Sequence, residues 1–113
     1  MITSIANAEH YIWGDNCEGW HLVKTPALSI IQERMPADTS EKLHYHALAQ
    51  QFFFILAGTA TFIVDGKTFI ISAPQGLHIL PGQVHQILNQ TDTDLLFTVT
   101  SQPTSRGDRI EVN

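Results

Sequence analysis

Residues 42–51 read KLHYHALAQQ, and residues 81–89 read PGQVHQILN. In the first stretch His44 and His46 are two positions apart, and side chains at this spacing leave the same face of a β-strand. Both imidazoles can therefore point at one ion if this stretch is extended. A pair of histidines alone is a weak signal, because the same spacing is common on ordinary protein surfaces. The residues that follow, and the second stretch, carry the rest of the argument.

Short β-like runs separated by turn residues surround these two stretches. Asp65-Gly66 joins two such runs and predicts a tight hairpin, because both residues tolerate a positive φ at low cost. No window keeps a 3.6-residue apolar period with helix caps, and many short strands at regular spacing favour an all-β sandwich or barrel. The expected strands are 19–24, 27–35, 52–56, 59–64, 67–71 and 94–100, with a loop at 36–40.

Composition limits the classes of function. The chain has 113 residues, of which 43% are hydrophobic, so one modest core and a single domain are expected. Its six Lys and Arg residues are scattered and its formal net charge is −5, which argues against a nucleic-acid or anionic-membrane surface. No apolar run is long enough to cross a bilayer, and the N-terminus lacks a secretory signal. Cys17 is the only cysteine, which excludes an intrachain disulfide. We therefore expect a soluble, cytoplasmic protein.

The spacing of the polar residues resembles the two signature motifs of the cupin superfamily. Four residues separate His46 from Gln51 and six separate Gln51 from Gly58, as in the first motif; a proline-glycine turn, His85 and Asn89 follow as in the second. The resemblance covers residues 38–89. It implies an all-β, jelly-roll-like double-stranded β-helix barrel of two antiparallel sheets. Residues 1–24 would be an N-terminal arm with strands, and residues 101–113 a C-terminal edge segment.

The resemblance also implies one divalent metal ion, held by His44, His46, Gln51 and His85. Gln51 stands where the family usually has glutamate, and the neighbouring Gln50 does not keep the interval to the glycine. Zn, Ni, Fe, Mn and Co all suit such ligands. Imidazole ligands normally donate their other ring N–H to an acceptor, for which Asn89 or a backbone carbonyl is a candidate.

Departures from the family pattern affect its turns and one ligand. Asp38 and Pro74 stand where glycines open the two motifs, and Leu80 where the second has its proline. The change at Gln51 matters most, because four neutral ligands leave the charge of the ion uncompensated. Such an ion is a stronger Lewis acid, which favours polarisation of a carbonyl or hydroxyl over oxygen activation.

Residues outside the motifs give weaker candidates for catalysis. His78 could face the cavity as an acid or base, and more often such a histidine is a wall residue. Glu33 and Arg34 are adjacent in a strand, so only one can face inward: Glu33 as a general base, or Arg34 as a carboxylate-binding group. His10 and His21 are expected at surface or lid positions. The Asp108-Arg109 pair is expected to form a surface ion pair or a dimer contact.

Three functions are compatible with the sequence. The first is a metal-dependent isomerase, lyase or dioxygenase acting on a sugar, uronate or organic acid. The second is a metal-bearing module that binds a small polar ligand without turnover, and the third is a metal-free dimeric scaffold. The run Phe52-Phe53-Phe54-Ile55-Leu56 places large apolar side chains on both faces of a strand. One face can fill the barrel, and the other is covered either by another sheet of the same domain or by a second copy of the chain; we favour the homodimer.

Overall fold

The computed structural model describes all 113 residues and contains strands, turns and loops without a helix. No segment forms a helix that could span a membrane. The strands are β1 (Glu9–Trp13), β2 (Cys17–Lys24), β3 (Ser29–Met35), β4 (Thr39–Ser40), β5 (His44–His46), β6 (Gln50–Ala57), β7 (Thr59–Val64), β8 (Lys67–Ser72), β9 (Gly76–Ile79), β10 (His85–Asn89), β11 (Leu95–Gln102) and β12 (Arg109–Glu111). The six strands expected from the sequence are all present; 59–64 has the expected bounds, and the other five have shifted ends.

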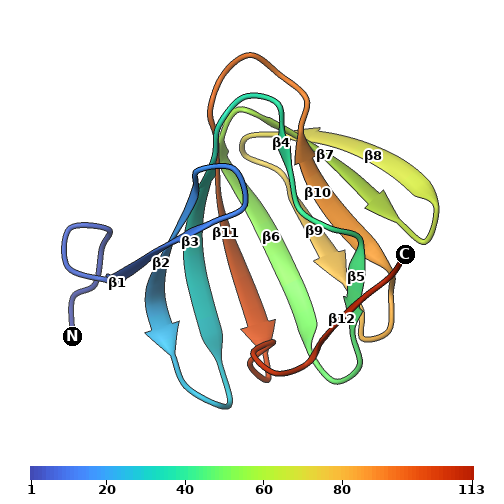
Figure 1. The fold of residues 1–113 in the computed structure, drawn as a ribbon. Helices are drawn as coiled ribbons and strands as arrows, with labels where there is room; N and C mark the ends of the chain where they lie inside the picture. The colour runs from blue at the N-terminus through green and yellow to red at the C-terminus, as the bar shows by residue number, and fades with distance from the viewer.

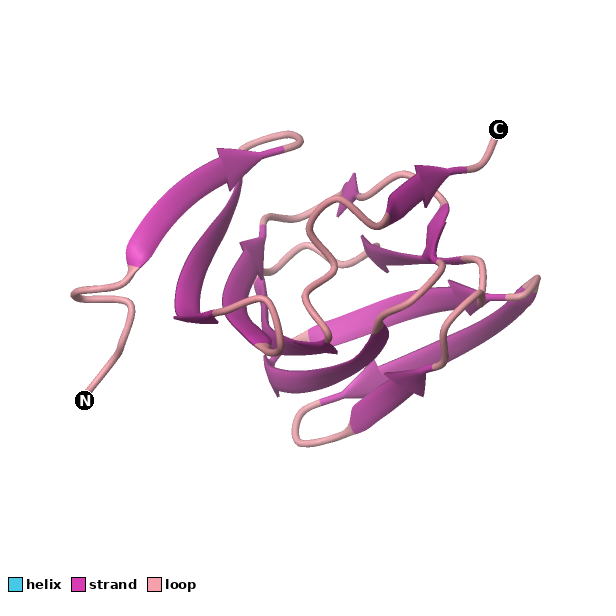
Figure 2. Cartoon of the chain, turned by 90° about the horizontal axis from the view of Figure 1, so that it is seen from below, coloured by secondary structure: helices cyan, strands magenta, loops and turns pink.

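The strands form two antiparallel sheets that face each other (Figure 1). The first sheet has the order β1-β2-β3-β11-β6-β9, and the second has the order β12-β5-β10-β7-β8, with β4 also paired to β10. Seen from below, the sheets are separate layers, and the N-terminal strands curve away at one side (Figure 2). The predicted barrel of two antiparallel sheets is confirmed.

The core lies between the two sheets because each strand alternates inward and outward side chains. In β6, Phe53 and Ile55 are buried, whereas Phe52 and Leu56 on the opposite face are exposed. Phe53, Ile55, Phe62, Ile87 and Phe97 belong to one cluster of buried residues. The continuous apolar run of β6 thus fills the interior with one face only.

Turn residues adopt the backbone conformations that their types allow. Asp65 and Gly66 have φ values of 49° and 80°, and they join β7 to β8 as the predicted hairpin. Asp38 has a φ of 57°, in the left-handed region that favours glycine and that Asp tolerates better than most residues. This conformation explains how Asp38 replaces the glycine of the family motif.

Gly58 joins β6 to β7 with a φ of 88°, and a Cβ at this position would lie 2.7 Å from the backbone oxygen of Asp94. Gly66 has a similar φ, but a Cβ there would meet nothing within 4 Å. Gly66→Ala should lower the free energy of unfolding by about 1 kcal/mol, the cost of the left-handed conformation. Gly58→Ala should cost about 3 kcal/mol, because the backbone of a second strand must also move. Urea denaturation of the two variants measures the difference, and equal losses would contradict the proposed overlap.

Candidate metal centre

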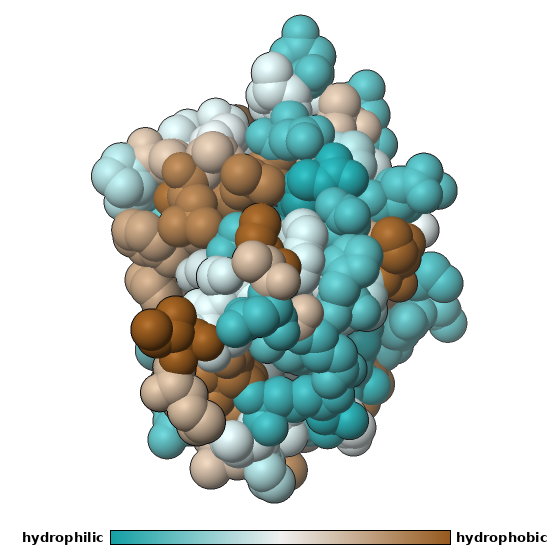
Figure 3. Space-filling view, turned by 90° about the vertical axis from the view of Figure 1, so that its left-hand side faces the viewer, coloured by the Kyte–Doolittle hydropathy of each residue, from teal (hydrophilic) through white to brown (hydrophobic).

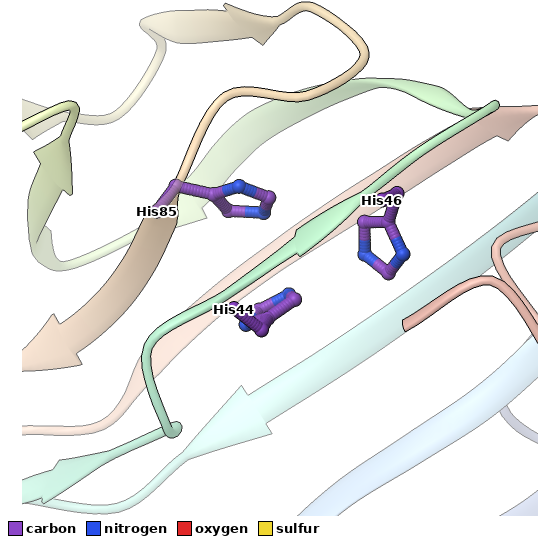
Figure 4. A group of neighbouring side chains, drawn as sticks. All are labelled: His44, His46 and His85. Atoms are coloured by element: carbon purple, nitrogen blue, oxygen red, sulfur yellow. The ribbon is translucent and has the colours of Figure 1, made fainter. Parts of the chain in front are cut away.

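Three imidazoles from two neighbouring strands converge inside the barrel. His44 and His46 leave the same face of β5, and the antiparallel pairing of β5 with β10 places His85 opposite His44. Their rings point toward a common region (Figure 4), and one ring nitrogen of each lies within 4.8 Å of the others. All three side chains are buried. The convergence expected from the sequence is present.

Each imidazole is oriented by a backbone carbonyl at its Nδ1. The Nδ1 atoms of His44 and His85 lie 2.8 Å from the carbonyl oxygens of Lys42 and Gln83. The Nδ1 of His46 lies 3.2 Å from the carbonyl oxygen of Asp108. A neutral imidazole that donates its Nδ1–H keeps a lone pair on Nε2. The three rings therefore present lone pairs, as metal ligands require.

Asn89 is not the acceptor for these rings. Its amide group donates to the backbone oxygens of Met35, Pro36 and Thr93, at 2.9, 3.1 and 2.8 Å. Of the two candidates named from the sequence, the backbone carbonyls serve the imidazoles, and Asn89 holds two loops together.

Gln51 comes from β6 in the opposite sheet and faces His85. Its Oε1 lies 3.2 Å from Nε2 of His85, and its Nε2 donates to the hydroxyl of Ser101 at 3.0 Å. His85 thus has an acceptor beside each ring nitrogen, but a neutral imidazole carries one proton. A cation between Nε2 of His85 and Oε1 of Gln51 would accept a lone pair from each atom. The Nδ1–H of His85 would then continue to donate to the carbonyl oxygen of Gln83. The donor set therefore fits a metal ion, and it fits Gln51 as the fourth ligand.

Burial keeps these histidines neutral. It lowers the pKa of His44 to about 3 and lowers the pKa values of His46 and His85, against weaker opposing effects of their backbone acceptors. Neutral imidazole is the form that binds metal ions, so protons compete weakly for these three ligands near pH 7.

Asp108 holds the turn after the histidine pair. Its carboxylate accepts hydrogen bonds from the backbone N–H groups of Ala47, Leu48 and Ala49, at 3.1, 2.9 and 2.9 Å. These bonds keep its pKa below the ordinary range although burial opposes them. The surface ion pair expected for Asp108 is therefore wrong: the side chain connects the C-terminal segment to the strand that carries two imidazoles.

His44, His46 and Gln51 line a cavity of about 400 Å³, and the fully buried His85 is not part of this lining. This volume lies within the range of small-molecule sites. Apolar side chains such as Phe53, Ile87 and Phe97 form part of its wall, and Glu33, Glu41 and Arg109 add charged groups. The cavity thus combines an apolar part of its wall with a larger number of polar and charged groups.

Burial perturbs two carboxyl groups in this cavity. It raises the pKa of Glu33 to about 8, with a further contribution from the nearby charge of Glu41. It raises the pKa of Glu41 to about 7, although Arg109 and the backbone N–H of Ile87 stabilise the ionised form. Glu33 is therefore mostly protonated at neutral pH and can donate as well as accept a hydrogen bond.

The structure separates the three weak candidates for catalysis. Glu33 faces the cavity, whereas the neighbouring Arg34 faces outward and pairs with Glu18 at 2.7 Å and Asp94 at 3.2 Å. The alternative in which Arg34 faces inward is therefore wrong. Successive side chains of a strand point to opposite faces, and Glu33 occupies the inward face of β3. His78 is also outside the cavity: it is exposed, and its Nε2 lies 2.8 Å from Oε1 of Gln50.

Several residues that line the cavity were not predicted from the sequence. His21 was expected at a surface or lid position, but it lines the cavity together with Tyr11. Glu41 and Arg109 were also not expected there, and their Oε2 and Nη1 atoms are 3.8 Å apart. Glu41 lies three residues before His44 in the motif, which was the available signal. The others lie at the two ends of the chain, and their position depends on how the terminal strands pair.

Comparisons with known proteins support the fold. A family model described as "Cupin domain" matches residues 31–101. A predicted oxalate decarboxylase from Thermotoga maritima is 23% identical, with a TM-score of 0.84 over 92% of this chain and 100% of that one. A sugar phosphate isomerase from Silicibacter pomeroyi is 18% identical, with a TM-score of 0.82 over 92% of this chain and 76% of that one. No curated protein matches the sequence.

The raised pKa of Glu33 predicts a pH-dependent stability. The native carboxyl keeps its proton up to about pH 8, whereas the unfolded one loses it near pH 4.5, so this group reduces stability as the pH rises through that window. Glu33→Gln should therefore raise the free energy of unfolding by about 4 kcal/mol at pH 8 and leave it nearly unchanged at pH 4.5. Denaturation followed by circular dichroism at both pH values measures this. The exposed Asp92→Asn is the control, and a stabilisation independent of pH would contradict the assignment.

Proposed function

Because the chain belongs to the cupin domain family, we propose that it is a metal-dependent enzyme that acts on a small oxygenated molecule. The observation that supports this proposal is the convergence of three neutral imidazoles, of which His85 lies beside the Oε1 of Gln51, next to a cavity of about 400 Å³ that His44, His46 and Gln51 line. Under this proposal His44, His46 and His85 bind one divalent ion through Nε2, and Gln51 binds it through Oε1.

The ligand set favours polarisation of the substrate. A divalent ion held by four neutral ligands supplies an uncompensated Lewis acid for a carbonyl or hydroxyl oxygen. Ferrous oxygenases more often add a carboxylate ligand. An isomerase or lyase reaction is therefore favoured over a dioxygenase reaction. The fold is shared with proteins named as a predicted oxalate decarboxylase and a sugar phosphate isomerase, which supports small oxygenated substrates.

Glu33 is the residue of this chain best suited to proton transfer. Its carboxyl is protonated near pH 7, lines the same cavity as the imidazoles and has no salt-bridge partner. A carboxyl with a pKa near the working pH can give a proton to a substrate oxygen or carbon and later take one back. Glu41 is less free, because its Oε1 accepts a hydrogen bond from the backbone N–H of Ile87 at 3.1 Å.

Metal content and turnover test this function together. Protein purified without an affinity tag should contain about one divalent ion per chain by elemental analysis, and His85→Ala should lose it. His78→Ala is the matched control, because this histidine lies outside the cavity. Metal-loaded protein should convert at least one member of a panel of keto acids, uronates and sugars, and metal-stripped protein should not.

Two results would overturn the enzyme proposal. Absence of metal from the wild-type protein, or equal metal content in His85→Ala, would favour the metal-free scaffold. Bound metal and tight ligand binding without turnover for any of several metals would favour a binding module.

A homodimer is the second proposal, and it rests on the outer face of the first sheet. Phe52 and Leu56 of β6 are 45% and 44% exposed there, and Phe54 lies between them on the same face. Hydrophobic side chains also gather on one side of the face shown in Figure 3, beside a hydrophilic side. A second copy of the chain would cover the outer face of β6 and remove this apolar surface from water.

Sedimentation velocity tests the dimer. The wild-type protein should sediment as a dimer and Leu56→Glu as a monomer, because a charge cannot be buried there without a partner. Ile70→Glu is the control, since Ile70 is 69% exposed on β8 of the other sheet. A monomeric wild-type protein, or a dimer lost only in Ile70→Glu, would contradict this choice of surface.

A further inference from the structure

The N-terminal strands contribute a second polar group of side chains to the cavity of the histidine cluster. Tyr11 of β1, His21 of β2 and Glu33 of β3 line the same cavity as His44 and His46. Trp13 lies beside them, in an adjoining hollow of about 210 Å³ that Tyr11 and Glu33 also line. These four residues, which we call the N-terminal wall, have no role in holding the proposed ion.

The register of the first three strands builds this wall. Tyr11 pairs with Gly19, and Gly19 pairs with Glu33, so the three residues form one row across β1, β2 and β3. A Cβ at Gly19 would overlap the Tyr11 ring, which shows that the ring lies directly over this glycine. The absence of a side chain at Gly19 therefore lets the tyrosine lean across β2. The ring of His21 is 4.9 Å from that of Tyr11.

The polar atoms of the N-terminal wall have few partners within the protein. Trp13 Nε1 and His21 Nδ1 are buried and make no hydrogen bond. Trp13 Nε1 lies near enough to the Glu33 carboxyl to favour its ionised form, but without hydrogen-bond geometry. The Tyr11 hydroxyl also makes no hydrogen bond, and burial with the nearby Glu33 raises its pKa. Buried polar groups in native proteins are usually satisfied, so a group of unpartnered ones in a cavity indicates ligand contacts.

Neighbouring polar side chains differ in this respect. Glu41 is held by the backbone N–H of Ile87, and Arg109 lies near both Glu41 and the carbonyl oxygen of Lys42. Arg34 on the outer face is fully paired. The buried side-chain atoms without a partner are therefore both in the N-terminal wall, whereas the cavity residue Arg106, which also has no side-chain partner, is exposed.

The chemistry of these groups matches hydroxyl groups. A phenol and a protonated carboxyl can each donate and accept a hydrogen bond, and an indole can donate one. A neutral imidazole donates at one ring nitrogen and accepts at the other. A hydroxyl group also donates and accepts, so several hydroxyls on one molecule can satisfy all four residues. Arg106 and Arg109 also line the cavity and can face a carboxylate, whereas a hydroxyl-free diacid would leave the hydrogen-bonding groups of the neutral N-terminal wall without partners.

We propose that Tyr11, Trp13, His21 and Glu33 recognise the hydroxyl groups of a polyhydroxylated small molecule whose reacting oxygen lies at the histidine cluster. This inference rests on the proposed function and narrows its substrate from any small oxygenated molecule to a hydroxyl-rich one. It also assigns part of the substrate specificity to the N-terminal hairpin formed by β1 and β2, which lies outside the part of the chain that carries the metal motif.

Tyr11→Phe is the central variant, because it removes only the hydroxyl and keeps the ring over Gly19. Tyr45→Phe is the matched control, since Tyr45 lies between the two histidines of β5 and is not part of the cavity wall. The probes are glucose, fructose, gluconate and glucuronate, compared with the hydroxyl-free succinate and glutarate. Binding is measured by saturation-transfer NMR titration on zinc-loaded protein, and zinc content is measured for each variant.

At least one hydroxyl-rich probe should bind more tightly than both diacids. Tyr11→Phe should weaken that binding about three- to tenfold, as loss of one hydrogen bond does, whereas Tyr45→Phe should leave it unchanged. Gly19→Ala should weaken binding as well, because it displaces the ring. Zinc content should be equal in all four proteins.

Tighter binding of the diacids, no binding of any hydroxyl-rich probe, or an unchanged affinity in Tyr11→Phe would overturn the inference. A failure of the proposed metal function would appear separately, as absence of zinc from the wild-type protein, and titration of metal-stripped protein still measures the wall itself.

Discussion

The antiparallel pairing of β5 with β10 is the constraint on which the site depends. It places His85 opposite His44, and strand alternation adds His46 to the same inward face. These rings are then fixed by bonds from Nδ1 to backbone oxygens, which cannot move without disrupting the strands or turns that carry them. The orientation of the three rings is thus set mainly by backbone oxygen atoms.

Contacts between the two sheets complete the site. Gln51 comes from the first sheet and reaches His85 in the second, so the proposed ligand set joins both layers of the barrel. The two acceptors around His85 compete for its single proton, and a shared cation removes that competition. On the second sheet, Asp108 connects the C-terminal segment to β5, because its carboxylate accepts hydrogen bonds from the turn after His46 and its carbonyl oxygen lies beside the ring of His46. Residues distant in sequence therefore control one small volume.

The cavity also has two parts with different proposed roles, metal binding and substrate recognition. His44 and His46 line the cavity from the second sheet, and the carboxyl of Glu33, whose pKa is raised, lines it from the first. Gly19 connects these observations to the N-terminal hairpin, since only a residue without a side chain lets Tyr11 lie across β2. A barrel of common architecture can thus acquire its own specificity through the strand pair added at its edge.

The sequence by itself determined the all-β barrel and the four residues proposed to bind metal. Strand periodicity and motif spacing are local properties, and a two-residue spacing has the same meaning in any strand. A cytoplasmic location stays a prediction of the sequence. The tertiary structure alone decided which of Glu33 and Arg34 faces inward, that His78 lies outside, and that Tyr11, His21 and Arg109 reach the cavity. These outcomes depend on strand register and on pairing between the ends of the chain, which no local pattern encodes.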